Sequence, residues 1–224
     1  MPAPDRERNP ARTRAAILDA AEQLFAERGY DTTSLSDVGT LAGVSRATPG
    51  YFFGSKPELY RAVLDRCFDD VRAAVRSGRD RALASGRTPE EILAGAVGEY
   101  FDFLNSHREF VRLIERAALG GPDLPVDIPP ALAAGQEALT AMAAELGLDP
   151  DPSGEAAQVL LSIISLCWFP IVHADTVAAA VGVELDTPER LAERREHVIA
   201  LTLRALRGRQ AATGARRLEP FTGR

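Results

Sequence analysis

Signals that begin and end helices recur along the chain, and no segment sustains the apolar and polar alternation that is typical of a strand. Many starts combine a Ser, Thr, Asn or Asp with a following proline or glutamate. The small polar side chain accepts hydrogen bonds from the free N–H groups of the first helical turn. Glycines follow, and glycine readily adopts the left-handed conformation that ends a helix. The sequence therefore predicts an all-α fold of about nine helices.

The predicted boundaries follow from these signals. Predicted helix starts are Asn9-Pro10, Ser34, Ser45, Ser55-Lys56-Pro57-Glu58, Thr88-Pro89, Ser106-His107, Pro129-Pro130, Asp151-Pro152 and Thr187-Pro188. Predicted stops are Gly29, Gly43, Gly86, Gly120-Gly121, Gly147 and Gly208. At 224 residues the chain has room for one small and one medium domain.

Composition limits the classes of function. The net charge of −6 gives no overall attraction to nucleic acid or to an anionic membrane, so any site for a polyanion must be local. Cys67 and Cys167 are too few for a disulfide framework, and the N-terminus lacks the apolar segment of a secretion signal. We expect a cytoplasmic protein. The apolar run Val159 to Val172 is shorter than the ~20 residues that cross a bilayer, and so predicts a buried helix without membrane contact.

The segment from Ser34 to Phe53 has the spacing of two short helices joined through a glycine-containing turn. Such a helix-turn-helix can place its second helix in the major groove of DNA. Arg46 can bind guanine edges or phosphate, Thr48 can contact phosphate or a thymine methyl, and Tyr51 can bind phosphate. Lys56 can bind phosphate at the start of the next helix. Spacing alone leaves open a helical hairpin that never meets DNA.

The longer stretch Ala15 to Leu64 reads AAILDAAEQLFAERGYDTTSLSDVGTLAGVSRATPGYFFGSKPELYRAVL. It resembles the TetR family of bacterial regulators: AAEQLFAERGYDTTS resembles the first helix and the entry to the second, AGVS the turn, and YFFGSKPELY the exit into a long connecting helix. The resemblance implies an N-terminal three-helix DNA-binding domain and a larger helical domain for ligand binding and dimerisation. The residues expected to contact DNA are Thr33, Ser34, Ser45, Arg46, Ala47, Thr48, Gly50, Tyr51 and Lys56.

Two departures from the family pattern fall inside the helix-turn-helix. Pro49-Gly50 stands where the family usually has Leu-Tyr, and Gly39 stands where alanine is common. Proline removes a backbone donor and disfavours the α conformation of the residue before it, so we expect a short or irregular reading helix. Glycine is a weak helix former, so we expect a slightly weaker second helix.

Charge supports DNA binding only locally. Residues 1–60 contain seven Arg or Lys against eight Asp or Glu, whereas the segment before the first helix concentrates Arg6, Arg8, Arg12 and Arg14 against two acids. Such an arm can reach a minor groove. A solvated tail is the alternative interpretation.

The sequence after residue 80 contains no recognisable catalytic motif, and we expect neither enzyme activity, nor a cofactor, nor a metal site. Aromatic residues in two predicted helices and in the segment CWFPIVHAD are candidates to line an effector pocket, although simple core packing is the alternative. The candidate ligand-binding residues are Tyr100, Phe101, Phe110, Trp168, Phe169 and His173.

We thus expect a flexible arm over residues 1–10, a DNA-binding domain over 11–60, a sensing and dimerising domain over 61–208, and a tail over 209–224. The resemblance implies a homodimer formed through about 152–183 and 188–207. We expect a repressor whose partners are double-stranded operator DNA, a second copy of itself and a small-molecule effector. The alternative is an all-α enzyme or ligand-binding protein whose N-terminal helical hairpin is merely structural.

Overall fold

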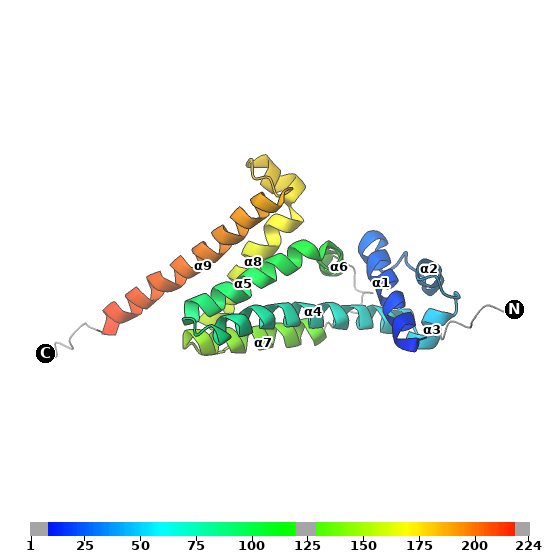
Figure 1. The fold of residues 1–224 in the computed structure, drawn as a ribbon, viewed down its shortest axis with the longest axis horizontal. Coiled ribbons are helices and arrows are strands. Elements are labelled where there is room, and N and C mark those ends of the chain that lie inside the picture. Colours follow the sequence, from blue (N-terminus) through cyan, green and yellow to red (C-terminus); the bar gives the residue numbers. More distant parts are fainter. Residues whose placement is uncertain (1–8, 120–128, 218–224) are drawn as a thin grey trace. The chain divides into compact units, whose positions relative to one another are not determined.

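The computed structural model describes residues 9–119 and 129–217, and in these ranges it contains nine α-helices, a short π-helical segment and no strand (Figure 1). The prediction of an all-α fold is confirmed. The elements are α1 (Pro10–Arg28), α2 (Leu35–Leu41), α3 (Thr48–Phe53), α4 (Lys56–Ala84), α5 (Pro89–Ser106), α6 (Arg108–Leu119), α7 (Pro129–Leu146), α8 (Glu155–Val172), η1 (Ala174–Ala178) and α9 (Pro188–Arg217). The predicted arm up to Arg8 and the predicted stop at Gly120-Gly121 lie outside the described residues.

The helices form two compact units. One contains Met1–Arg72 with His107–Gly135, and the other contains Ala73–Ser106 with Gln136–Arg224. Helices α1, α2, α3 and α6 belong to the first unit, and α5, α8, η1 and α9 belong to the second. The predicted division of function at residue 60 stays a prediction.

Helix α6 follows the predicted start at Ser106-His107, but the sequence did not indicate that it belongs to the first unit. Its Phe110 is buried and meets Phe68 of α4 edge to face, with the ring centroids 5.4 Å apart. Its Arg116 donates hydrogen bonds of 2.9 Å to the backbone carbonyls of Ala26 and Glu27. Arg116 therefore supplies donors for carbonyls that the C-terminus of α1 leaves without helical partners.

Most predicted helix starts agree with the structure. Asn9 Oδ1 accepts a 3.0 Å hydrogen bond from Ala11 N–H, and the predicted capping box at Ser55 is closed by Glu58. Two starts were wrong: α3 begins at Thr48 without a side-chain cap, and α8 begins at Glu155. Asp151 instead accepts hydrogen bonds from Ser153 N–H and Oγ–H in a local turn. The stop predicted at Gly208 was also wrong, because α9 continues to Arg217.

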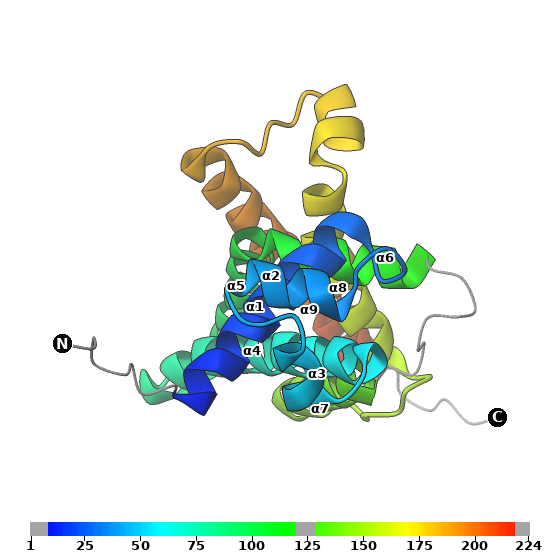
Figure 2. The ribbon, with the colours of Figure 1, turned by 90° about the vertical axis from the view of Figure 1, so that its right-hand side faces the viewer.

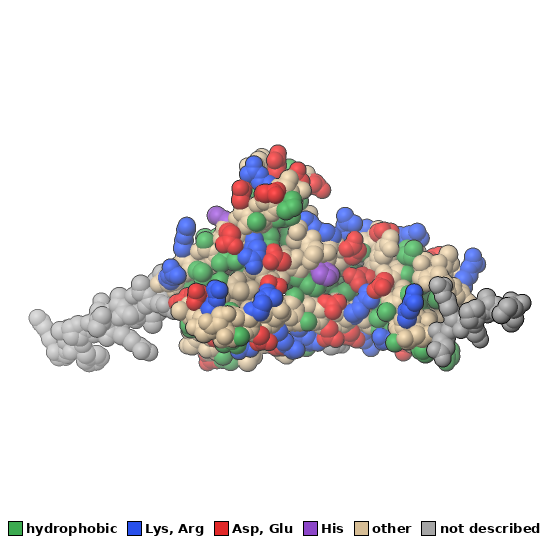
Figure 3. All heavy atoms as spheres, viewed as in Figure 1, with side chains coloured by type: hydrophobic (Ala, Val, Ile, Leu, Met, Phe, Trp, Pro, Cys, Tyr) green, Lys and Arg blue, Asp and Glu red, His purple; other side chains and the backbone are tan. Residues whose placement is uncertain are grey.

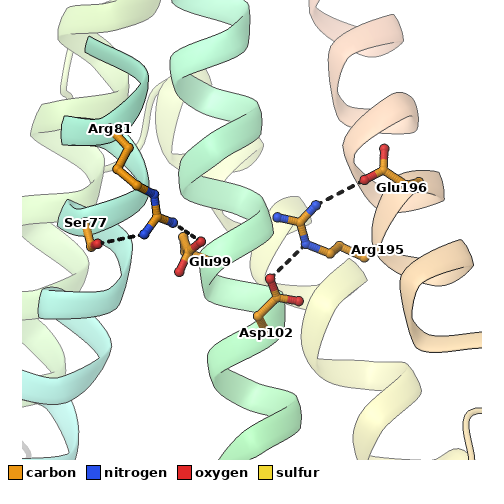
Figure 4. A network of polar contacts seen from close by, with 6 residues as sticks. All are labelled: Ser77, Arg81, Glu99, Asp102, Arg195 and Glu196. Carbon is orange, nitrogen blue, oxygen red and sulfur yellow. Dashed lines mark hydrogen bonds and ion pairs between the residues drawn. The ribbon is translucent and has the colours of Figure 1, made fainter. Parts of the chain in front are cut away.

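In the second unit, α5 packs against both α8 and α9. A Cβ atom placed on Gly78 of α4 would lie 2.6 Å from the carbonyl oxygen of Gly95, so the helix backbones meet where side chains are absent. Ion pairs also join α5 to its neighbours: Arg81 of α4 pairs with Glu99, and Arg195 Nε of α9 pairs with Asp102 at 2.9 Å (Figure 4). Glycine thus sets the spacing of the helices, and arginines join their exposed edges.

Helix α8 carries an internal proline, Pro170. Proline has no N–H, so the carbonyl oxygen of Leu166, four residues earlier, loses its helical donor. The guanidinium of Arg194 on α9 donates to this oxygen from Nη2 at 3.2 Å. Burial of the neighbouring Cys167 raises the pKa of its thiol to about 12, so this cysteine stays protonated at neutral pH.

Helix α8 is apolar enough over Glu155–Val172 to cross a membrane by length and composition alone, with a mean hydropathy of 1.7. Only 28% of that window is buried within the chain, so the prediction that this run forms a buried helix was wrong for the single chain. Hydrophobic side chains reach the surface beside charged ones (Figure 3). Among them are Leu161 and Phe169 of α8, which are 59% and 49% exposed.

Candidate nucleic-acid interface

Helix α2 begins with a complete capping box. Ser34 Oγ accepts a hydrogen bond from Asp37 N–H at 3.1 Å, and the Asp37 carboxylate accepts from Ser34 N–H at 3.1 Å. Hydrogen bonds from the Ser34 hydroxyl and backbone lower the pKa of Asp37, with smaller contributions from the charges of Arg28 and Arg46. Asp37 is therefore ionised at neutral pH, and it fixes the start of the helix that supports α3.

The turn after α2 closes with two backbone hydrogen bonds. Val44 N–H donates to the Gly39 carbonyl at 3.0 Å, and Gly43 N–H donates to the Thr40 carbonyl at 3.3 Å. Gly43 has a φ of 68°, which is the left-handed region that favours glycine. This pair of bonds is the Schellman arrangement, and it ends α2 while directing the chain toward α3.

Helix α3 is six residues long, as the presence of Pro49 led us to expect, but its conformation is α-helical. Pro49 lies in the first turn, where a backbone N–H has no helical partner, so its missing donor costs no hydrogen bond. Ser45 does not cap the helix: its hydroxyl lies 2.7 Å from the Thr48 hydroxyl, and one donates to the other.

Four of the predicted DNA-contacting residues form one exposed patch on the turn and on α3. Ser45, Arg46, Ala47 and Tyr51 are exposed, and the Tyr51 side chain is 86% exposed. The Arg46 guanidinium makes no hydrogen bond or ion pair with the described part of the chain, so its donors are free for a ligand. Figure 2 shows α2 and α3 as neighbouring short helices of the first unit.

Other predicted contact residues have internal roles. Thr33 is 2% exposed, and its hydroxyl donates to the Gly29 carbonyl at 2.8 Å. The Lys56 ammonium donates to the Asp31 carbonyl at 3.1 Å and lies 4.3 Å from the centroid of the Tyr30 ring. In the free chain these side chains hold the connection between α1 and α2, so a DNA contact from either would require it to leave its present partners.

Ser34, Thr48 and Gly50 complete the predicted set. The Ser34 side chain is engaged in the capping box, the Thr48 hydroxyl is paired with Ser45, and Gly50 is half-buried. The exposed Arg14 of α1 was predicted only as part of the basic N-terminal arm, and its guanidinium carbon lies 4.8 Å from the centroid of the Phe53 ring at the end of α3. Its place among the arginines before and within α1 was the only sequence signal.

The predicted ligand-binding residues are divided between the two units. Phe110 is buried in the first unit, whereas Tyr100, Phe101, Trp168, Phe169 and His173 belong to α5 and the end of α8 in the second. Burial raises the pKa of Tyr100, with a smaller contribution from Cys167. The ring centroids of Phe169 and His173 lie 4.4 Å apart. Within residues 9–119 and 129–217, no group of His, Cys, Asp or Glu has the arrangement of a metal site.

Comparison with known proteins gives two matches to family sequence profiles. The profile described as bacterial regulatory proteins, tetR family, matches residues 17–63. The profile described as tetracyclin repressor-like, C-terminal domain, matches residues 151–201. The first match covers α2, the turn and α3, and the second covers α8, η1 and part of α9.

The curated proteins and solved structures that are similar to the chain include the following three. The HTH-type transcriptional repressor NicS of Pseudomonas putida is 26% identical over 211 residues, which are 88% of this chain and 93% of NicS. The HTH-type transcriptional activator FasR of Mycolicibacterium smegmatis is 36% identical over 101 residues, which are 45% of this chain and only 44% of FasR. A TetR-like transcriptional regulator from Rhodococcus sp. RHA1 has the same fold, with a TM-score of 0.65, 20% identity, and coverage of 88% of this chain and 96% of the other.

Proposed function

The chain belongs to the tetR family of bacterial regulatory proteins, and we propose that it is a cytoplasmic transcriptional repressor that binds its operator as a homodimer and is released by a small effector. The observation that carries the proposal is the exposed patch on α3 and the turn before it. There the free guanidinium of Arg46 projects from the turn and the exposed phenol of Tyr51 projects from α3. Helix α2, which supports both, is capped at its start and closed by a Schellman turn at its end.

The chemistry of this patch suits duplex DNA. Arg46 can donate two parallel hydrogen bonds to the O6 and N7 atoms of a guanine in the major groove. Tyr51 can donate to a phosphate and so fix the position of the helix on the backbone. The ionised Asp37 beside Arg46 adds a repulsive contact for misplaced phosphates, which favours one orientation of the helix over others.

The apolar surface of the second unit supports a dimer. Leu161, Phe169 and Val181 are 59%, 49% and 71% exposed, although soluble chains seldom leave many large apolar side chains of one region in water. The same surface of a second copy, related by a two-fold axis, would cover them. Two copies of α3 about 34–36 Å apart would then fit two half-sites one DNA turn apart.

The effector would bind in the second unit, where Tyr100 and Trp168 combine apolar surface with polar tips and Phe169 adds apolar surface. Helices α4 and α7 each contribute residues to both compact units, so they are elements through which a change in the second unit can reach the first. Effector and operator would then weaken each other's binding by the same factor. The described residues contain nothing that favours the enzyme alternative over this one.

The test is the affinity for DNA from upstream of the chain's own gene, measured by fluorescence anisotropy at several salt concentrations. Replacing Arg46 by alanine should weaken binding of the dimer by about 30-fold or more, because it removes one bidentate base contact of about 1–3 kcal/mol from each of the two half-sites. Arg87→Ala removes the same charge from an exposed position in the second unit, and serves as the matched control. Equal affinities of the two variants, or an affinity that salt does not reduce, would contradict the proposal.

A further inference from the structure

The two departures from the family pattern meet in space. A Cβ atom built on Gly39 of α2 would lie 2.9 Å from the Ser45 carbonyl oxygen, 3.0 Å from Arg46 Cα and 3.3 Å from Pro49 Cδ. Contacts this short with backbone atoms require the backbone to move. Gly39 therefore permits the turn and the first residues of α3 to lie directly against α2.

The Pro49 ring packs into the space that is free because Gly39 has no side chain. This packing site is called the seat of Pro49. The ring is fully buried, although it lies on a helix of only six residues. The ring also fixes its own φ and restricts Thr48 before it, while Thr48 N–H donates to the Ser45 carbonyl at 2.9 Å. The segment from Ser45 to Pro49 is thus held against α2 both by contact and by restricted backbone freedom.

This arrangement removes two side chains from the surface that can face DNA. Position 49 is buried, and position 50 is a half-buried glycine whose Cβ would approach only the Leu35 side chain, at 3.8 Å. Of the four exposed residues, Ser45 and Ala47 are short. Arg46 and Tyr51 are then the side chains with the length to reach a base or a distant phosphate.

We propose that Pro49, seated against Gly39, is a specificity-determining residue that limits direct base readout by each chain to Arg46 and its short neighbours. It acts by setting how far Arg46 projects from α2, not by touching DNA. The inference rests on the proposed function, because it concerns the DNA sequence that the patch selects. It implies a half-site with one strongly selected guanine and weakly selected flanking bases.

The first experiment is selection of bound duplexes from random DNA, followed by sequencing. Pro49→Ala should bind DNA but select a different or broader half-site, because the segment carrying Arg46 is freed to move. Pro57→Ala is the matched control, since Pro57 is an exposed proline in the first turn of α4 and should leave the selected site unchanged. Selection of the wild-type site by Pro49→Ala would overturn the proposal.

The second experiment does not depend on DNA. Gly39→Ala should lower the thermal unfolding midpoint by about 5 °C, because overpacking against backbone is destabilising. In the Pro49→Ala background the same change should lower the midpoint by less than half as much, because the ring is gone and the backbone can yield. Equal decreases in the two backgrounds would show that Gly39 and Pro49 do not form a pair.

The two experiments separate the possible failures. If wild type selects no DNA site while the midpoints are coupled, the seat exists but the proposed function is wrong. If wild type selects a site and the midpoints are uncoupled, the proposed function stands and the seat is wrong. If Pro49→Ala does not fold, Gly39→Ala displaces the same segment from the other side, and an unchanged half-site for that variant would overturn the proposal.

Discussion

The short helix α3 and the apolar helix α8 each contain a buried proline, and the chain accommodates the two in different ways. Pro49 lies in the first turn of α3, where no hydrogen bond is lost, and its ring needs only the space beside Gly39. Pro170 lies inside α8, where it frees the Leu166 carbonyl, and Arg194 of α9 supplies a donor. The cost of a proline thus depends on its position in the helix and on what lies beside the freed carbonyl.

The two proline sites also differ in the kind of substitution that would disrupt them. The seat of Pro49 depends on the absence of a side chain, so it is sensitive to added volume. The repair at Pro170 depends on one long polar side chain, so it is sensitive to truncation. The Nε atom of Arg194 is buried without a partner, so the bond from Nη2 to the Leu166 carbonyl is made at the cost of one unpaired donor.

The largest loss of stability is expected from a new proline that lies neither in the first turn of a helix nor beside a replacement donor. Ala96→Pro in the middle of α5 should destabilise the second unit by about 3 kcal/mol or more, because it removes the helical donor of the Ile92 carbonyl and its ring clashes with that carbonyl. Glu90→Pro, in the first turn of the same helix, imitates Pro49 and should cost far less. Urea unfolding followed by circular dichroism measures both. Similar costs for the two variants would contradict the positional argument.

A smaller effect is expected from removing the repair at Pro170. Arg194→Met keeps the apolar stem but removes the donor, and should lower the free energy of unfolding by about 1 kcal/mol, since the lost hydrogen bond is partly offset by removal of the unpaired Nε. In the Pro170→Ala background, the backbone N–H of residue 170 again serves Leu166. The cost of Arg194→Met should then fall toward zero, as a double-mutant cycle would measure. An unchanged cost would show that Arg194 stabilises α8 for another reason.

The smallest effects separate the capped start of α2 from the uncapped start of α3. Ser34→Ala should lower the free energy of unfolding by about 1 kcal/mol, whereas Ser45→Ala should lower it by less than half of that, because Ser45 does not cap a helix.

The Asp37 carboxylate also makes the stability of the fold depend on pH. Its pKa is lowered in the folded chain, so its contribution is present above the usual value of 3.8 and is lost as the pH falls through the lower folded value. Asp37→Asn should flatten the acid side of the stability profile.

Local chemistry explains what the sequence could predict. The capping box at Ser34 and Asp37 and the turn at Gly43 depend on residues close together in the chain, and both were readable as patterns. Exposure of Arg46 and Tyr51 followed from their place after that turn. The all-α fold followed from the density of such local signals.

The remaining features depend on contacts between residues distant in sequence. Three such contacts join separate elements. Arg116 donates to the end of α1, Lys56 donates to the Asp31 carbonyl beside the Tyr30 ring, and Arg194 donates to the Leu166 carbonyl. Gly39 was read as a weakness of α2, because propensity counts only its own helix. The structure shows it to be the contact point for Pro49, so the two unusual residues are complementary.

The central claim is that two copies of the chain present Arg46 and its neighbours to two half-sites on one face of DNA. The most direct measurement is the affinity for the selected operator with and without five extra base pairs between its half-sites, because about half a helical turn moves one half-site to the opposite face. The account predicts a loss of affinity of at least about tenfold on this insertion, together with a lower sensitivity of the remaining affinity to Arg46→Ala. Equal affinity for both duplexes would mean that each chain reads DNA alone, and would contradict the account.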